Sequence, residues 1–233
     1  MITKSIVELY NTLAPVYDPV RPLWANLLAG RVERFLEQDI LLRYLPAGAA
    51  ILDIGCGTAA NLTRLRRLGL DFGCYVGVDL TPRMLRRAVR QTNDGRATFY
   101  RGDATCLPFA DGSFDFVLST WMLSHIPRPG QVVGEALRVL KEGGHFALLF
   151  WSRPAFPLNL AMRPVEWAFR MRCPLPWTCE GFSHQIVARR FSAGSQICMV
   201  FRKGDVTWST TSSLPAVASP AWPSPLSSEV GGY

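Results

Sequence analysis

The chain has 233 residues, of which 48% are hydrophobic, as expected for one folded domain rather than a disordered segment. It has no apolar run near the ~20 residues that span a bilayer and no signal-peptide pattern, so we expect a cytoplasmic protein. Its six cysteines are scattered without a C-x-x-C pair, which argues against a zinc site or a disulfide framework, and we predict no metal site.

The first part of the chain predicts helices ahead of any strand. Residues 5–14 begin at a serine and carry apolar side chains at helical spacing. Pro15 is expected to end this helix, because proline has no backbone N–H to donate. Residues 17–24 then form a proline-punctuated link, and residues 26–44 form a longer helix. The expected unit is a helical segment over residues 1–46.

Residues 50–79 have the pattern of a strand, a glycine turn, a helix and a second strand. Gly55 and Gly57 directly follow a short apolar run, where glycine allows a sharp turn and a close approach by a ligand. Leucines then recur at helical spacing, at positions 62, 65 and 68. Asp79 ends the second strand. This unit predicts a nucleoside-binding site. With Ala60 in the third place, it also fits the dinucleotide fingerprint of NAD(P)-dependent oxidoreductases.

Strands and helices continue to alternate after this unit. Further strands are predicted over residues 97–101, 114–119 and 144–151. One helix starts at Pro82 and another covers residues 131–140. Such alternation predicts a doubly wound α/β fold, with a parallel sheet and helices on both faces. The glycine turn and the acids would then meet at the carboxyl edge of the sheet, where ligands bind in such folds.

The last third of the chain has a different composition. Residues 152–181 mix large apolar side chains with arginines, which fits either a helix that covers the sheet or a surface for a lipid-tailed substrate. Residues 182–190 and 196–203 predict an antiparallel pair. Residues 205–233 are rich in Ser, Thr, Pro and Gly, and we expect a disordered tail without a chemical role.

The formal net charge of +7 is concentrated in one region. Residues 64–101 hold nine arginines against three aspartates, a local excess of +6. Either the outer helices carry solvated arginines, or this is a patch for anionic lipid headgroups. We expect no nucleic-acid binding, because the chain has no recognised nucleic-acid module and no aromatic side chains interleaved with the arginines.

The motifs together resemble the class I S-adenosylmethionine-dependent methyltransferases, most of all the branch with quinone-biosynthesis and small-molecule enzymes. They follow the family order over about residues 10–203 and are Leu52–Thr58, Gly77–Met84, Gly102–Phe109, Ser113–Val117 and Leu140–Phe146. The family's usual third glycine is Ala59 here. The resemblance implies a mostly parallel seven-stranded sheet with an antiparallel last strand. The methyltransferase core would cover residues 47–204, with an N-terminal helical lid and a substrate-covering insertion at about 152–181.

The resemblance also implies S-adenosylmethionine as the cofactor. Asp79 would hold the ribose and Asp103 the adenine amino group; the alternative for both acids is capping of a turn or helix. The residues expected at the cofactor are Tyr10, Tyr17, Asp53, Gly55, Cys56, Gly57, Asp79, Leu80, Met84, Gly102, Asp103, Ala104, Ser119 and Thr120. The residues expected in the substrate pocket are Trp24, Trp121, Met122, Trp151 and Trp167. His125 is the candidate general base, with a structural role as the alternative.

The function expected from the sequence is in-line methyl transfer to a small or lipid-like acceptor, whose accepting atom is oxygen, nitrogen or carbon. Two alternatives stay open: an NAD(P)-dependent oxidoreductase, and a catalytically silent cofactor-binding partner subunit. As partners we expect the acceptor and a peripheral membrane contact, with the chain a monomer or homodimer.

Overall fold

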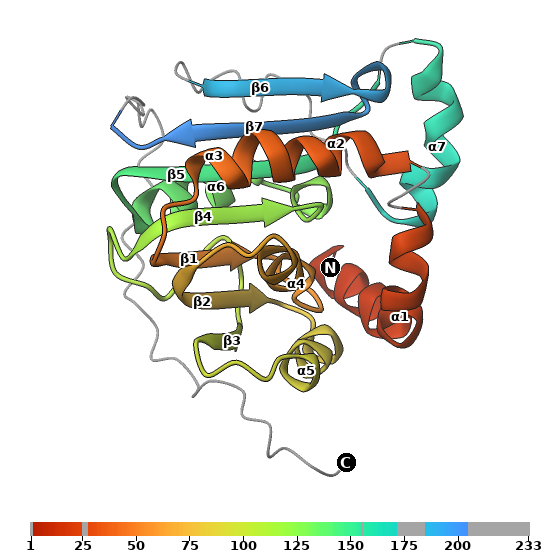
Figure 1. The fold of residues 1–233 in the computed structure, drawn as a ribbon. Coiled ribbons are helices and arrows are strands. Elements are labelled where there is room, and N and C mark those ends of the chain that lie inside the picture. The colour runs from red at the N-terminus through yellow and green to blue at the C-terminus, as the bar shows by residue number, and fades with distance from the viewer. Residues whose placement is uncertain (1, 25–27, 155, 172–184, 205–233) are drawn as a thin grey trace.

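The computed structural model describes residues 2–24, 28–154, 156–171 and 185–204, and within these ranges it contains one seven-stranded sheet (Figure 1). The strands are β1 (Ala49–Ile54), β2 (Phe72–Asp79), β3 (Ala97–Arg101), β4 (Phe114–Thr120), β5 (Leu140–Trp151), β6 (Gln185–Phe191) and β7 (Gln196–Arg202). Their order is β3-β2-β1-β4-β5-β7-β6. Strands β1 to β5 pair in parallel, and β7 is antiparallel to both of its neighbours. The predicted fold is confirmed.

Helices cover both faces of this sheet. The connecting helices are α4 (Ala60–Arg67), α5 (Pro82–Gln91) and α6 (Pro129–Val139). The chain before β1 contributes α2 (Gly30–Phe35), a π-helical stretch (Leu36–Leu41) and α3 (Leu42–Tyr44). Side chains alternate between the faces along each strand, so Ile51 packs in the core cluster that includes α2, α4 and α5, while Leu52 packs in the cluster with α6. Both side chains are fully buried.

Helix α1 (Ile2–Trp24) continues through Pro15, so the predicted break and the predicted link over residues 17–24 are wrong. Pro15 leaves the carbonyl of Asn11 without its usual helical donor. The guanidinium of Arg83 on α5 donates to that carbonyl at 3.3 Å, and the backbone N–H of Arg83 donates to the Asn11 side chain at 3.2 Å. A tertiary contact therefore replaces the hydrogen bond that the proline removes.

The two helical parts ahead of β1 occupy different places. Val32, Leu36 and Ile40 are fully buried in the core against the sheet, so the segment from α2 to α3 belongs to the packed domain. Helix α1 instead lies on the side where β1, β2 and β4 end (Figure 1). Of these two parts, α1 is therefore the one placed to cover a ligand at that edge.

Helix α7 (Leu158–Ala168) also lies beyond the ends of the parallel strands (Figure 1). The predicted antiparallel closing pair is confirmed by β6 and β7. The predicted tail over residues 205–233 and the end of the predicted insertion lie outside the described residues. In the described ranges, each helix is too short or too polar to span a membrane.

Candidate active site

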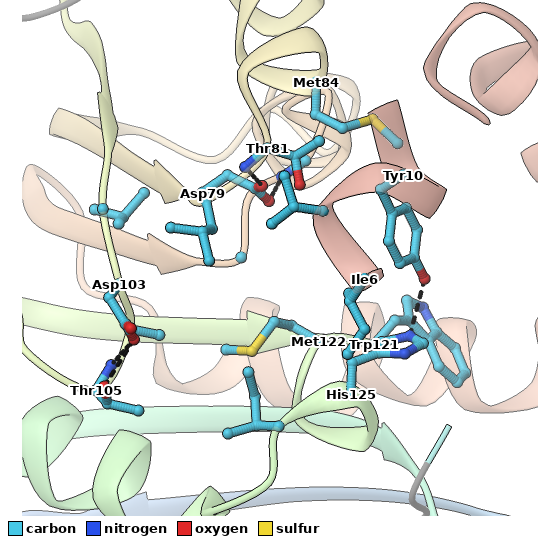
Figure 2. Close-up of a pocket in the computed structure, with 18 of the residues that line it drawn as sticks. Ile6, Tyr10, Asp79, Thr81, Met84, Asp103, Thr105, Trp121, Met122 and His125 are labelled. Atoms are coloured by element: carbon cyan, nitrogen blue, oxygen red, sulfur yellow. Dashed lines mark hydrogen bonds between the residues drawn. The ribbon is translucent and has the colours of Figure 1, made fainter. Parts of the chain in front are cut away.

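A cavity of about 250 Å³ opens at the carboxyl edge of the sheet. Its walls come from α1 and from the segments that follow β1, β2, β3 and β4 (Figure 2). In a doubly wound sheet this edge is the usual ligand site, because the connections after the parallel strands converge there. The predicted acids and glycines therefore meet in one place, as the order of strands implied.

The glycine turn after β1 is held by Asp79 at the end of β2. Gly55 has φ +75° and donates its N–H to the Val78 carbonyl at 2.8 Å. Gly57 has φ +54°, and its N–H donates to Oδ2 of Asp79 at 2.9 Å. Oδ1 of Asp79 accepts the N–H of Thr81 at 2.7 Å. The Asp79 carboxylate thus fixes the turn.

Burial raises the pKa of the Asp79 carboxyl, while the backbone hydrogen bonds from Thr81 and Gly57 lower it. Leu80 and Met84 line the cavity beside this acid. A second carboxylate follows β3: Oδ1 of Asp103 accepts the N–H of Thr105 at 2.8 Å and its hydroxyl at 2.7 Å. Figure 2 shows Asp79 and Asp103 on the same side of the cavity, each joined to the residue two positions later. Both acids therefore cap the turn that follows their strand, and the two hydrogen bonds from Thr105 to Asp103 fall on the same oxygen.

The segment after β4 forms the opposite wall. Trp121 has φ +65°, an uncommon conformation for a bulky residue, and it is buried. Its indole N–H donates to Glu33 of α2 at 2.9 Å, and its ring packs against Trp151 with centroids 5.2 Å apart. Thr120 and Met122 line the cavity on either side of it. Such a strained and supported residue is typical of a functional site.

His125 closes this wall and meets the helix that covers the cavity. Its Nε2 forms a hydrogen bond of 2.8 Å with the hydroxyl of Tyr10 on α1 (Figure 2). Its Nδ1 is buried and has no hydrogen-bond partner within the described ranges. Burial lowers the pKa of the imidazole to about 4, although the nearby Phe169 backbone raises it. The ring is therefore neutral at physiological pH.

This buried imidazole predicts an acid-sensitive fold. Between about pH 7 and about pH 5, His125 becomes protonated in the unfolded chain, where its ordinary pKa is ~6.5, but not in the folded chain. As the pH falls from about 7 to about 5, the free energy of unfolding should therefore decrease by about 2 kcal/mol because of this group. The raised pKa of Asp53, about 6, acts in the opposite direction. Urea unfolding of wild type and of His125→Asn at both pH values separates the contribution of the imidazole from that of the other groups. An equal pH dependence in the two proteins would contradict the assignment.

Helix α1 reaches the cavity at two tyrosines and is tied to the core beside them. Tyr10 and Tyr17 both line the cavity. Burial raises the pKa of each phenol, so both stay protonated. Asp18 accepts the hydroxyl of Thr58 at 2.6 Å and the Nε–H of Arg87 at 2.9 Å, which joins α1 to the glycine turn and to α5.

Asp53 does not line the cavity. It is fully buried beneath the glycine turn, where it accepts hydrogen bonds from the Tyr75 hydroxyl and from Asn61. The Asn61 amide also donates to the Thr120 hydroxyl at 2.9 Å. Burial raises the pKa of Asp53 to about 6, and the hydrogen bonds from Tyr75 and Asn61 oppose this. The structure therefore makes Asp53 a support that reaches the cavity through Asn61 and Thr120.

Four other predicted residues, Cys56, Ser119, Trp151 and Trp167, are not brought to the cavity. The buried Cys56 directs its sulfur toward Gly77 of β2, and Ser119 donates to the Ile54 carbonyl at 3.0 Å. Trp151 stands behind Trp121, and the Trp167 side chain is 85% exposed. The Trp24 side chain lies outside the described residues. The remaining predicted residues all line the cavity: Tyr10, Tyr17, Gly55, Gly57, Asp79, Leu80, Met84, Gly102, Asp103, Ala104, Thr120, Trp121, Met122 and His125.

The cavity also contains residues that the sequence did not indicate. They are Ile6, Val7, Val78, Thr81, Thr105, Pro127 and Arg128. Thr105 belongs to a motif already noted, so its position next to Asp103 was available as a signal. Ile6 was on the expected apolar stripe of the first helix, but the sequence does not say which surface that stripe meets.

Comparisons with known proteins agree with this geometry. Residues 52–148 match the family described as "Methyltransferase domain". The chain is 32% identical over 169 residues to a demethylmenaquinone methyltransferase of Roseiflexus sp. (strain RS-1), covering 72% of this chain and 68% of the relative. It is 34% identical over 155 residues to a 2-methyl-6-phytyl-1,4-hydroquinone methyltransferase of Synechocystis sp., covering 62% of this chain and 46% of the relative.

The same architecture occurs in a solved S-adenosylmethionine-dependent methyltransferase from Mesorhizobium loti. The TM-score is 0.59 at 19% identity, covering 72% of this chain and 97% of that one, which supports the fold alone. The oxidoreductase alternative finds no support in these relatives. The chain therefore belongs to the class I S-adenosylmethionine-dependent methyltransferases, in the branch that contains the quinone-biosynthesis enzymes.

Proposed function

We propose that this methyltransferase transfers the methyl group to a quinone-like lipid acceptor, and that the cavity holds both the cofactor and the acceptor ring. The main support for the proposal is that two different walls of the cavity face each other. One has carboxylates at the ends of β2 and β3, and the other has aromatic side chains and a histidine after β4. The relatives from Roseiflexus and Synechocystis, named for demethylmenaquinone and a phytyl hydroquinone, support this acceptor class.

The residues fit the cofactor. A Cβ built on Gly57 would meet no atom within 4 Å, so the turn leaves open space beside its backbone. In our proposal the sugar hydroxyls donate to Asp79, and the adenine amino group donates to Asp103. When bound, S-adenosylmethionine supplies an electrophilic methyl group on a positively charged sulfur, which the nearby carboxylates favour. The protein then has to position the acceptor and exclude water.

His125 is proposed to take the acceptor's hydroxyl proton. For Nδ1 to accept that proton, Nε2 must carry the ring hydrogen and donate it to the Tyr10 oxygen. Tyr10 is thus proposed as a residue that orients His125, in addition to its expected place at the cofactor. Because burial makes the imidazole a weak base, we expect about a hundredfold contribution to turnover, at the lower end of general-base catalysis.

The test is an assay with methyl-labelled cofactor and a polyprenyl hydroquinone that lacks a ring methyl group. We expect label in the lipid product, and about a hundredfold slower turnover in His125→Ala with cofactor affinity retained. His145→Ala is the matched control, because His145 lies against Tyr44, away from the cavity. Label that appears only in amine or other non-quinone fractions would overturn the acceptor class. Transfer to no acceptor would favour the silent partner subunit.

A further inference from the structure

Helix α7 presents an uncovered stripe of large apolar side chains. Phe156 lies just before the helix, and Leu160 and Trp167 are seven positions apart within it, a spacing that places these two on one side of the helix. Their exposed fractions are 77%, 53% and 85%. A single exposed apolar residue is ordinary, but two on one side of a helix, with a third just before it, form a patch that marks an interaction surface.

Arginines share this stripe. Arg163 lies three positions after Leu160 and four before Trp167, and it is exposed. Arg153 and Arg170 are exposed on either side of the helix. Glu166 is the only acid between residues 152 and 171, and it is partly buried. Exposed Trp, Phe and Leu combined with arginine and little negative charge form the pattern of a helix that lies in a membrane interface.

The C-terminal end of α7 also lies next to the proposed site. The Phe169 backbone, one residue after the helix, is close enough to His125 to affect its pKa. At 11 residues, α7 is too short to span a bilayer, which needs ~20 residues. A second copy of the chain is a poor occupant, because a two-fold contact on this stripe would bring its arginines together.

We propose that the α7 stripe, defined as Phe156, Leu160, Arg163 and Trp167, docks on an anionic lipid bilayer. The aromatic and aliphatic side chains enter the interface, and the arginine pairs with lipid phosphates. The inference deepens the proposed function, because a lipid-tailed acceptor would then reach the His125 wall directly from the bilayer in which its tail resides.

Flotation of the full chain with phosphatidylglycerol–phosphatidylcholine vesicles tests the surface. We expect salt-sensitive binding that falls about tenfold or more in Arg163→Glu, because a cation near an anionic surface contributes strongly. Trp167→Ser should weaken binding at least about fivefold through the lost interfacial contact. Pure phosphatidylcholine vesicles should bind weakly. The variants change exposed side chains, so they should melt like wild type.

Matched controls distinguish binding through the α7 stripe from nonspecific binding of the protein to vesicles. Leu42→Ser removes a residue that is 46% exposed on α3, toward the opposite edge of the sheet (Figure 1). Arg43→Glu makes the same charge change at an exposed position of α3, outside the arginine-rich region 64–101. Both controls should bind vesicles like wild type. Equal losses in controls and stripe variants, no vesicle binding, or self-association that Trp167→Ser abolishes would each overturn the docking proposal.

The two proposals fail in different ways. Transfer to a short-tailed, water-soluble hydroquinone should be unchanged in Arg163→Glu and Trp167→Ser, because neither residue lines the cavity. If only docking is wrong, this transfer persists while vesicle binding is absent or insensitive to the stripe. If only the acceptor class is wrong, vesicle binding keeps its dependence on the stripe while no hydroquinone is methylated.

Discussion

Replacing Asp79 with alanine should weaken the binding of S-adenosylmethionine about a hundredfold, or about 3 kcal/mol, because two hydrogen bonds to a carboxylate are lost. The same carboxylate accepts the N–H groups of Gly57 and Thr81, so some stability should also be lost. Isothermal titration calorimetry measures the affinity, and a thermal melt confirms that the variant is folded.

Asp115→Ala is the matched control for this experiment. Asp115 accepts the backbone N–H of Ala50 at 2.9 Å, so its removal also frees a backbone donor. It stands at the start of β4, outside the lining of the cavity. We expect Asp115→Ala to lose stability but to bind the cofactor like wild type. Unchanged affinity in a folded Asp79→Ala protein would contradict the proposed ribose role.

Replacing Gly55 with alanine should destabilise the fold by about 3 kcal/mol, from the left-handed backbone and from overpacking together. At φ +75°, a Cβ on Gly55 would stand 2.5 Å from Cγ and 2.6 Å from Cβ of Met122. Met122 lines the cavity, so any shift that relieves the clash also changes the site. Cofactor affinity should fall together with the urea midpoint.

Gly57→Ala distinguishes packing from ligand contact. At φ +54° its Cβ would meet no protein atom within 4 Å, so the expected cost in stability is only about 1 kcal/mol. If the cofactor lies against this turn, the added methyl group should still lower its affinity by about tenfold or more. A Gly55→Ala protein as stable as wild type would show that the turn is more open than the structure indicates.

The site was predictable where a short stretch of sequence defines both a strand and the turn at its end. Gly55 and Gly57 directly follow β1, and Asp79 is the last residue of β2, so a parallel sheet brings them to one edge. The direction in which each side chain points was harder to predict from the sequence. Asp53 lies two residues after Ile51 and hence on the same face of β1, beneath α4. That alternation was a signal against direct contact with the ligand.

Long-range partners account for the other differences. Nothing near Pro15 in the sequence indicates that Arg83, on a distant helix, satisfies the carbonyl that the proline leaves free. Trp167 is one of several aromatic residues after the last parallel strand, and only the direction of α7 decides that it faces solvent. Such outcomes depend on how elements pack, which local periodicity does not encode.

The most direct test of the account is a crystal structure with S-adenosylhomocysteine bound. We predict the nucleoside in the cavity at the carboxyl edge, with the ribose hydroxyls donating to Asp79 and the adenine amino group beside Asp103. A nucleoside bound elsewhere, or either carboxylate turned away from it, would contradict the account.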